Sequence, residues 1–346
     1  MKSERLKNLS LIKFIGSIFT KKHIKPCKGI EVKMDTVTMN TVTKKKNKRL
    51  AKSGPLLLIA LPGITYLIIN NYIPMFGIFL AFKDYNYAKG IFKSDWCGLK
   101  NFVYLFKQDA FVIVRNTLLY NLTFIVVGTA AAIFVAILMF ELGTMARVKF
   151  LQSALLLPNL LSWVIIAFIG FAFLNSDTGF INKTVINFFG GNEVAWYTTP
   201  KYWPFILTLV YLWKNVGYSS IIYMASISGI DKSIFEAAKI DGATKLKQIR
   251  YITIPMLKPT IIILTLMAIG RIFYSDFGLF YQVSMDSGAL YNTTQTIDTY
   301  VYHGLMKLNN VGMSAAAGLY QSAIGFVLVV LANAFVKKVD KENALF

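Results

Sequence analysis

The stretch NTLLYNLTFIVVGTAAAIFVAILMF, residues 116–140, contains no charged residue and is long enough to cross a lipid bilayer as an α-helix. A helix needs about 20 predominantly apolar residues to span the hydrocarbon core. The rest of the chain has the same character, because 55% of its 346 residues are hydrophobic and only 16% are charged. Soluble domains carry about 25% charged residues. The sequence therefore predicts an integral membrane protein with several spans.

Six apolar blocks predict an all-α fold with six transmembrane helices. They cover approximately residues 55–82, 112–142, 150–174, 203–227, 260–280 and 314–336. We expect residues 55–346 to form one transmembrane domain, preceded by a basic cytoplasmic tail, residues 1–54. Met34 or Met39 is an alternative start of translation, because the stretch that begins at Met39 already resembles a complete short basic leader.

The net charge of +20, from 37 Lys+Arg and 17 Asp+Glu, indicates how the chain is oriented. Basic residues concentrate on the cytoplasmic side of membrane proteins. They gather in the tail, near Arg147 and Lys149, in the loop 228–259 and at the C-terminus, so both termini are predicted to be cytoplasmic. This topology explains the basic charge without nucleic acid binding. It also places Cys27 inside and Cys97 outside, so that the two cysteines cannot pair.

The loop GIDKSIFEAAKIDGATKLKQIRYITIPMLKP, residues 229–259, is predicted to fold on the cytoplasmic side. Ser233 and Glu236 have the spacing of a capping box, which begins a helix. Gly242 can end that helix with a positive φ. A second short helix should follow, and Pro255 and Pro259 should break the chain before the fifth span. A folded, partly apolar cytoplasmic loop is suited to docking a soluble partner.

Within this loop, EAAKIDGA followed by IP resembles the EAA loop of ABC importer permeases. The matching residues are Glu236, Ala237, Ala238, Asp241, Gly242, Ala243 and Pro255. Ile254 departs from the pattern, since Leu is more usual before this proline. The resemblance implies that the loop is the coupling helix, which sits in a groove of the ATPase subunit, and that the fold is that of a type I ABC importer permease.

The resemblance extends over residues 54–346 and is specific to the polysaccharide and aldouronate branch of the carbohydrate permeases. The segments that carry it include LPGITYLIINNYIPMFGIFLAFKDY at 61–85, GLKNF at 98–102, RNTLLY at 115–120 and TYVYHGL at 299–305. It implies transport of an oligosaccharide or polysaccharide fragment across the bacterial cell membrane. It also implies a second permease subunit, two ATPase subunits and an extracellular substrate-binding lipoprotein as partners.

The sequence contains no G-x-x-x-x-G-K-[ST] motif, so we expect no nucleotide site in this chain, and ATP-Mg bound by the partner ATPase. It also lacks H-E-x-x-H and Cys/His metal patterns, and no catalytic constellation or metal site is predicted. The chain is thus interpreted as a transporter subunit and not as an enzyme.

Polar residues inside predicted spans are candidates for the sugar path, because such groups tend to face the bundle interior. Aromatic, hydroxyl and amide groups suit a sugar, and we predict that Asn121, Trp163, Tyr218 and Tyr274 line the path at mid-depth. The alternative for each is hydrogen bonding between helices. Arg271 and Asp276 could balance each other's charge. Other functions left open are an importer permease for a non-sugar solute, a glycan-processing membrane enzyme, and a sensor or channel subunit.

Overall fold

The computed structural model describes residues 58–106, 110–143 and 145–339. The predicted tail, Cys27, Met34 and Met39 lie outside the described residues. Contacts divide the chain after Asn70 into two units. The described part of the first unit, residues 58–70, is helical, and the amide of Asn70 donates to the carbonyl of Tyr66 at 3.0 Å. The second unit holds the other elements named below.

Within the described ranges, five single helices are long and apolar enough to span a membrane, and one bent pair, counted as one span, makes a sixth. The single helices are Leu58–Phe82, Phe111–Glu141, Pro200–Ser228, Lys245–Ile269 and Val311–Lys338. The predicted all-α architecture with six spans is thereby confirmed, while the third and fifth spans differ from the prediction in course and in bounds.

The elements follow one another with short connections. The first part of the second unit contains η1 (Ile68–Tyr72, which begins in the first unit), α3 (Ile73–Met75), η2 (Phe76–Phe82), β1 (Lys83–Asp84), α4 (Gly90–Lys93), β2 (Asp95–Trp96) and α5 (Lys100–Phe106). The central part contains α6 (Ala110–Glu141), α7 (Met145–Leu160), α8 (Trp163–Leu174), η3 (Ile181–Ile186), η4 (Trp196–Thr198), η5 (Pro200–Tyr202) and α9 (Trp203–Ser228). The last part contains α10 (Lys232–Ile240), α11 (Lys245–Gln248), η6 (Ile249–Thr253), α12 (Ile254–Ile269), η7 (Gly278–Val283), η8 (Gly288–Leu290), α13 (Tyr291–Thr294), α14 (Ile297–Met306) and α15 (Val311–Val339).

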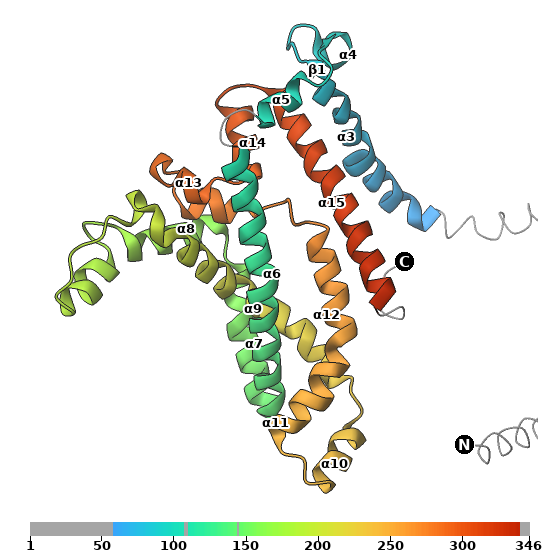
Figure 1. The fold of residues 1–346 in the computed structure, drawn as a ribbon, viewed down its shortest axis with the longest axis vertical. Coiled ribbons are helices and arrows are strands. Elements are labelled where there is room, and N and C mark those ends of the chain that lie inside the picture. The colour runs from blue at the N-terminus through green and yellow to red at the C-terminus, as the bar shows by residue number, and fades with distance from the viewer. Residues whose placement is uncertain (1–57, 107–109, 144, 340–346) are drawn as a thin grey trace, which may run out of the picture. The chain divides into compact units, whose positions relative to one another are not determined.

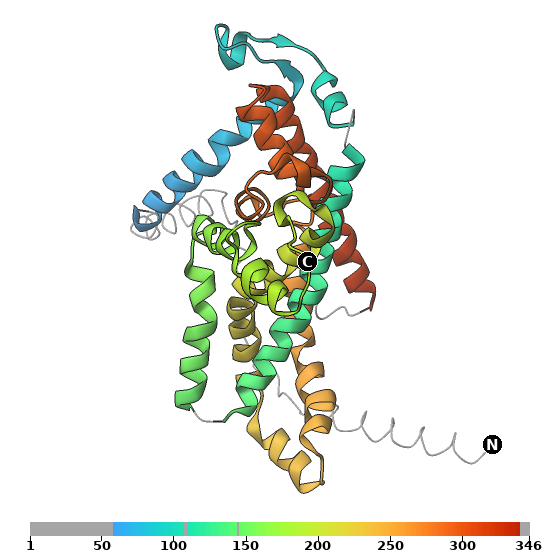
Figure 2. The ribbon, with the colours of Figure 1, turned by 90° about the vertical axis from the view of Figure 1, so that its left-hand side faces the viewer.

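The connections alternate between two ends of the helices, as six spans require. Figures 1 and 2 place α10 and α11 at one end of the group formed by α6, α9 and α12, and β1, α4 and α14 at the other end. β1 and β2 pair antiparallel in a two-stranded sheet. The predicted cytoplasmic loop and the predicted outer loops therefore lie on opposite sides.

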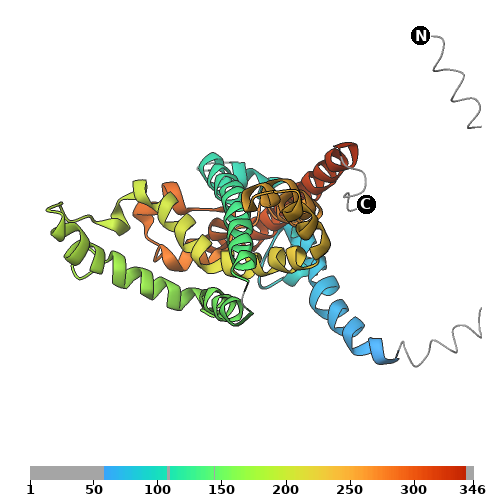
Figure 3. The ribbon, with the colours of Figure 1, turned by 90° about the horizontal axis from the view of Figure 1, so that it is seen from below.

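The third span, predicted over 150–174, consists of two helices at a bend instead of one continuous helix. α7 and α8 meet at an angle of 93° across a two-residue break. Seen from below in Figure 3, α8 runs sideways from α7. Ser162 is the N-cap of α8, and its Oγ accepts from the backbone N–H of Ile165 at 3.4 Å. A new N-cap at this position starts a second helix axis instead of continuing the first.

The bend interrupts the helical hydrogen bonds at the end of α7, and the carbonyl groups there need other donors. Lys214 of α9 is such a donor. Its buried ammonium group donates to the carbonyls of Pro158, Asn159 and Leu161, at 3.3, 3.0 and 2.5 Å. Backbone polar groups must be satisfied internally where water is excluded. α7 and α9 approach closely enough for this at Gly217, where a Cβ atom would lie 1.9 Å from the carbonyl oxygen of Leu155.

The fifth span begins earlier than predicted and ends earlier. α11, η6 and α12 form one helix, Lys245–Ile269, so the expected break at Pro255 and Pro259 is wrong. The wider π-helical turn of η6 directly precedes Pro255, which occupies the first turn of α12. Such turns change the hydrogen-bond pattern of a helix locally and accompany missing donors. The helix then ends at Gly270, and residues 271–276 are not helical.

The non-helical segment after α12 is held by side chains from two neighbouring helices. Asn121 of α6 donates its amide to the carbonyls of Ile272 and Tyr274, at 2.9 and 3.0 Å. Gln321 of α15 donates to the carbonyl of Phe273 at 2.8 Å. Irregular backbone at membrane depth is tolerated where protein groups satisfy it, so these two amides allow the fifth span to stop short.

Small residues bring the helices of the second and last spans close to their neighbours. Ala132 of α6 and Ala316 and Ala317 of α15 are fully buried. Ala132 and Ala136 form one core cluster with Tyr223 and Ile227 of α9. Lipid provides no hydrophobic drive between helices, so close packing of small side chains contributes much of the contact.

Candidate coupling and translocation site

The loop between α9 and α12 folds into α10, and the predicted helix begins two residues earlier than expected. Asp231 is its N-cap, and its carboxylate accepts from the backbone N–H of Ser233 at 3.0 Å. The hydrogen bonds from Ser233 hold the pKa of the Asp231 carboxyl below its usual range. The predicted capping box of Ser233 and Glu236 is therefore wrong, since a carboxylate two residues upstream takes the capping position.

Glu236 has no structural task among the residues that the structure describes. Its side chain is exposed, and among the described residues it has no hydrogen bond or ion pair. Ala237 is also exposed, and Ala238 is half-buried. The part of the loop that carries the EAA pattern therefore faces outward.

Gly242 ends α10 as predicted. Its φ is +77°, and the N–H of Ala243 donates to the carbonyl of Ala238 at 2.9 Å, while the N–H of Gly242 donates to Lys239 at 3.1 Å. These two bonds form a Schellman motif, which satisfies the last carbonyls of a helix and needs a residue that tolerates positive φ. Asp241, between the helix and Gly242, is exposed. The turn directs the chain from α10 into α11.

One face of this loop is fixed to α6, and the other has no partner among the described residues. Phe235 packs against Phe140 with ring centroids 5.8 Å apart, and Lys245 pairs with Glu141 at 2.8 Å. On the other face, Ile240 is 87% exposed and Leu246 is 78% exposed. Exposed apolar side chains on a rigid loop are typical of a docking surface.

A cavity of about 410 Å³ lies between the middle parts of α6, α9 and α12. It is lined by Phe124, Ile125, Gly128, Thr129, Tyr211, Asn215, Val216, Tyr218, Ser219, Ile222, Tyr223, Leu264, Ala268 and Arg271. Its volume is within the range of small-molecule sites. Aromatic rings, hydroxyl groups, an amide and a guanidinium group thus line one space at about half the length of α9.

The structure brings only one of the four predicted path residues into this cavity. Tyr218 lines it and is half-exposed. Asn121 and Tyr274 lie together, because the Asn121 amide donates to the Tyr274 carbonyl, and the Tyr274 hydroxyl lies 2.6 Å from Oγ of Ser322. Trp163 lies beneath the Lys214 ammonium group, 4.9 Å from its ring centroid. These three have contacts between helices, the alternative that the sequence left open.

Sequence reasoning missed Tyr211, Thr129 and Ser219 as cavity residues, although the four-residue spacing of Tyr211, Asn215 and Ser219 places them on one face of a helix. It also proposed that Arg271 and Asp276 balance each other. The structure gives no ion pair between them, since Asp276 accepts from the backbone N–H groups of Gly278 and Leu279 at 3.1 and 3.4 Å.

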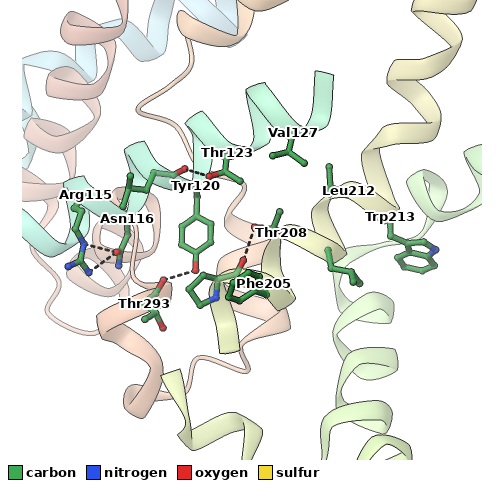
Figure 4. A pocket seen from close by; sticks show the side chains of 13 residues that line it. Arg115, Asn116, Tyr120, Thr123, Val127, Phe205, Thr208, Leu212, Trp213 and Thr293 are labelled. Carbon is green, nitrogen blue, oxygen red and sulfur yellow. Dashed lines mark hydrogen bonds between the residues drawn. The ribbon is translucent and has the colours of Figure 1, made fainter. Parts of the chain in front are cut away.

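A larger groove of about 1090 Å³ lies between α6 and the first half of α9, and Figure 4 shows its side chains. Its lining is mainly apolar, and most of its polar groups are already engaged within the chain. Arg115 donates to Asn116 at 3.1 Å and to the carbonyl of Asn292 at 3.2 Å, and the Tyr120 hydroxyl donates to the carbonyl of Thr293 at 2.9 Å. The smaller cavity, by contrast, presents the guanidinium group of Arg271, which has no such partner in the described part of the chain.

Comparison with known proteins agrees with this arrangement. The model of the family "Binding-protein-dependent transport system inner membrane component" matches residues 110–341. The chain is similar to the polygalacturonan/rhamnogalacturonan transport system permease protein YteP of Bacillus subtilis, with 33% identity over 91% of this chain and 99% of that protein. It is also similar to the protein LplB of the same organism, with 31% identity over 88% and 99%.

Among solved structures, a chain of a bacterial ABC transporter for the acidic polysaccharide alginate matches with a TM-score of 0.77 and 28% identity, over 86% of this chain and 99% of that chain. A second structure, with an alginate pentasaccharide-bound periplasmic protein, matches with a TM-score of 0.76 and 29% identity, over 85% and 98%. The match over two thirds of the residues and the full-length relatives show that this membrane protein belongs to the family of binding-protein-dependent transport system inner membrane components, the permease subunits of ABC importers.

Proposed function

We propose that this chain forms part of a transmembrane path for oligosaccharides and couples that path, through α10, to ATP hydrolysis in a separate subunit. One observation carries the proposal. α9 and α12 both line the 410 Å³ cavity, and α10 lies in the loop that joins their ends. A displacement of α10 therefore acts on two walls of the cavity.

The contacts of α10 support a mechanical role. The Phe140–Phe235 packing and the Lys245–Glu141 ion pair attach the loop to α6, which lines the same cavity. Glu236, Ile240 and Leu246 remain exposed on the other face. We assign this face to the groove of an ABC ATPase. Glu236, Ala237, Ala238, Asp241, Gly242, Ala243 and Pro255 are the residues of the proposed coupling element.

The cavity supports a sugar as the substrate. Tyr211, Tyr218, Asn215 and Ser219 offer ring faces, hydroxyl groups and an amide, which suit the alternating apolar and hydroxyl surface of a carbohydrate. The similar proteins are named for transport of polygalacturonan, rhamnogalacturonan and alginate. These names favour an oligosaccharide over a non-sugar solute.

The remaining parts of the proposed importer are a second permease subunit, two ATPase subunits that bind ATP-Mg, and an external binding protein that delivers the sugar. The absence of a Walker A motif from the sequence supports a separate ATPase. The solved relative in complex with a periplasmic protein supports a binding-protein partner.

Purification of the native complex through a tag on this chain tests the proposal. We expect a second permease and an ATPase to copurify, and the complex in proteoliposomes to take up trisaccharides when ATP and the binding protein are added. The chain purified alone should not hydrolyse ATP. Robust ATPase activity of the chain alone, or a complex that transports no trisaccharide, acidic or neutral, would contradict the proposed function.

A further inference from the structure

Arg271 lies in the short non-helical segment after α12 and lines the 410 Å³ cavity with Tyr211, Asn215 and Tyr218. The other three residues belong to the middle of α9, so the guanidinium group is at about mid-depth of the proposed path. Ionisable residues at this depth are rare, and they mark substrate or ion pathways.

The guanidinium group of Arg271 has no hydrogen bond or ion pair with any residue that the structure describes. The neighbouring charged groups are engaged elsewhere: Lys214 donates to the carbonyls at the end of α7, and Asp276 accepts from the backbone N–H groups of Gly278 and Leu279. The Arg271 side chain is exposed and faces the cavity without a counter-charge among the described residues. Its guanidinium group is therefore free to bind an anionic group, which the substrate can bring.

The geometry of the guanidinium group selects the anion. Its planar fork of N–H donors matches a carboxylate in a bidentate manner. Asn215 lies in the same cavity, and its amide donates to the Tyr211 carbonyl at 3.1 Å, which leaves its side-chain oxygen to accept from a hydroxyl group. A sugar unit that bears one carboxylate and several hydroxyl groups fits this combination.

We infer that Arg271 is a specificity-determining residue that binds the carboxylate of an acidic sugar unit, so that the transported oligosaccharides contain uronic acids. This inference rests on the proposed function, because it assigns a substrate class to the same cavity. It adds a residue that recognises charge, whereas Tyr211, Asn215 and Tyr218 recognise the sugar ring and its hydroxyl groups.

The test compares tri-galacturonate with the same trisaccharide after its carboxyl groups have been reduced to alcohols. Binding of each to the purified complex in nanodiscs is measured without the binding protein, so that delivery does not affect the result. We expect Arg271→Gln to lower the ratio of acidic to neutral affinity by about 10- to 100-fold, the effect of losing a charge-assisted hydrogen-bonded pair. Arg271→Lys, which keeps the charge and loses the fork, should give a smaller decrease.

Arg115→Gln is the matched control, because the Arg115 guanidinium group is already hydrogen-bonded within the chain and lies outside the 410 Å³ cavity. It should leave the ratio unchanged. An unchanged ratio in Arg271→Gln, or an equal loss for both trisaccharides, would overturn the inference and leave the proposed function standing. If the wild-type complex binds and transports neither trisaccharide, the proposed function fails, and this inference with it.

Discussion

The Nζ atom of Lys214 lies 2.5 Å from the carbonyl oxygen of Leu161, so a charged side chain of one span completes the end of a helix in another. The same ammonium group reaches the carbonyls of Pro158 and Asn159. This relationship holds the bend between α7 and α8 and explains why a lysine is buried among apolar helices.

Replacement of this lysine should destabilise the protein. Lys214→Met retains a long side chain but leaves the carbonyls of Asn159 and Leu161 at the bend without a donor, while the Pro158 carbonyl still accepts from the backbone N–H of Leu161 at 3.3 Å. Each buried unsatisfied carbonyl costs about 1–3 kcal/mol, so we expect a clearly lower midpoint of thermal unfolding in detergent. Lys201→Met, at an exposed position, is the control and should unfold as the wild type does. Equal midpoints for both variants would contradict the proposed role of Lys214.

Gly242 should be sensitive to substitution because of its backbone conformation alone. A Cβ atom there meets no heavy atom within 4 Å, but the φ of +77° disfavours L-residues by about 1 kcal/mol or more. We expect Gly242→Pro to abolish ATP-driven uptake while the protein still inserts into the membrane. Gly242→Asn should be milder, since Asn tolerates positive φ. Gly288→Ala, at a glycine with equally open surroundings and no positive φ, should transport normally.

The two acidic residues of α10 should separate capping from partner binding. Glu236→Ala leaves the Asp231 cap intact, so loss of coupled transport in this variant would report a contact with the ATPase, which we expect. Asp231→Ala should instead fray α10, and Asp231→Asn should retain the cap. Copurification of the ATPase and uptake assays measure both effects. Full transport by Glu236→Ala would remove Glu236 from the coupling element.

The Asp231 cap also has a defined pH dependence. Its pKa in the folded state is lowered by the hydrogen bonds from Ser233. The contribution of the cap is therefore present above the ordinary pKa of an aspartate, about 3.9, and is lost as the pH falls through the lower value of the folded state. Coupling measured between pH 6 and 8 should show no change that depends on Asp231. A change in this window in the wild type that disappears in Asp231→Asn would contradict the assignment.

Sidedness is tested with Cys97, which directly follows β2. The paired strand β1 lies at the opposite end of the helices from α10 (Figure 1). An impermeant maleimide should label Cys97 in intact cells, slowly, because the thiol is half-buried and accepts from the Asn101 amide at 3.4 Å. A cysteine at exposed Lys239, in a Cys97→Ser background, should react only after permeabilisation. The reverse pattern would invert the predicted orientation.

Much of this architecture is predictable from sequence, because apolar blocks and basic loops are local properties of the chain. The helix α10 and its end at Gly242 are also predictable, because this helix end needs a positive φ and glycine adopts that conformation more easily than other residues do. The bend at Ser162 is not, because its stabilisation comes from Lys214, more than fifty residues away, and hydropathy does not report such a contact.

The fifth span shows the same limit. Two prolines predict a break, but a π-helical turn before Pro255 accommodates the missing donor and keeps the helix continuous. Its early end depends on Asn121 and Gln321, whose amides satisfy backbone carbonyls from other helices. For the cavity residues, the sequence predicts only that a polar side chain within a span faces away from lipid. It does not reveal whether the residue faces a substrate, as proposed for Tyr218, or a backbone carbonyl, as Asn121 does.

The attachment of α10 at both ends has a consequence for how the importer works. A helix tethered at one end would push on a single wall of the cavity, like a piston. α10 is tethered to α9 and to the unbroken helix that runs from Lys245 to Ile269, so a partner that tilts it applies a torque to two walls at once. We therefore expect the two walls to rotate together about the α6 contacts and the cavity to switch its opening as one unit, without a state in which a single wall has moved and the sugar can leak through.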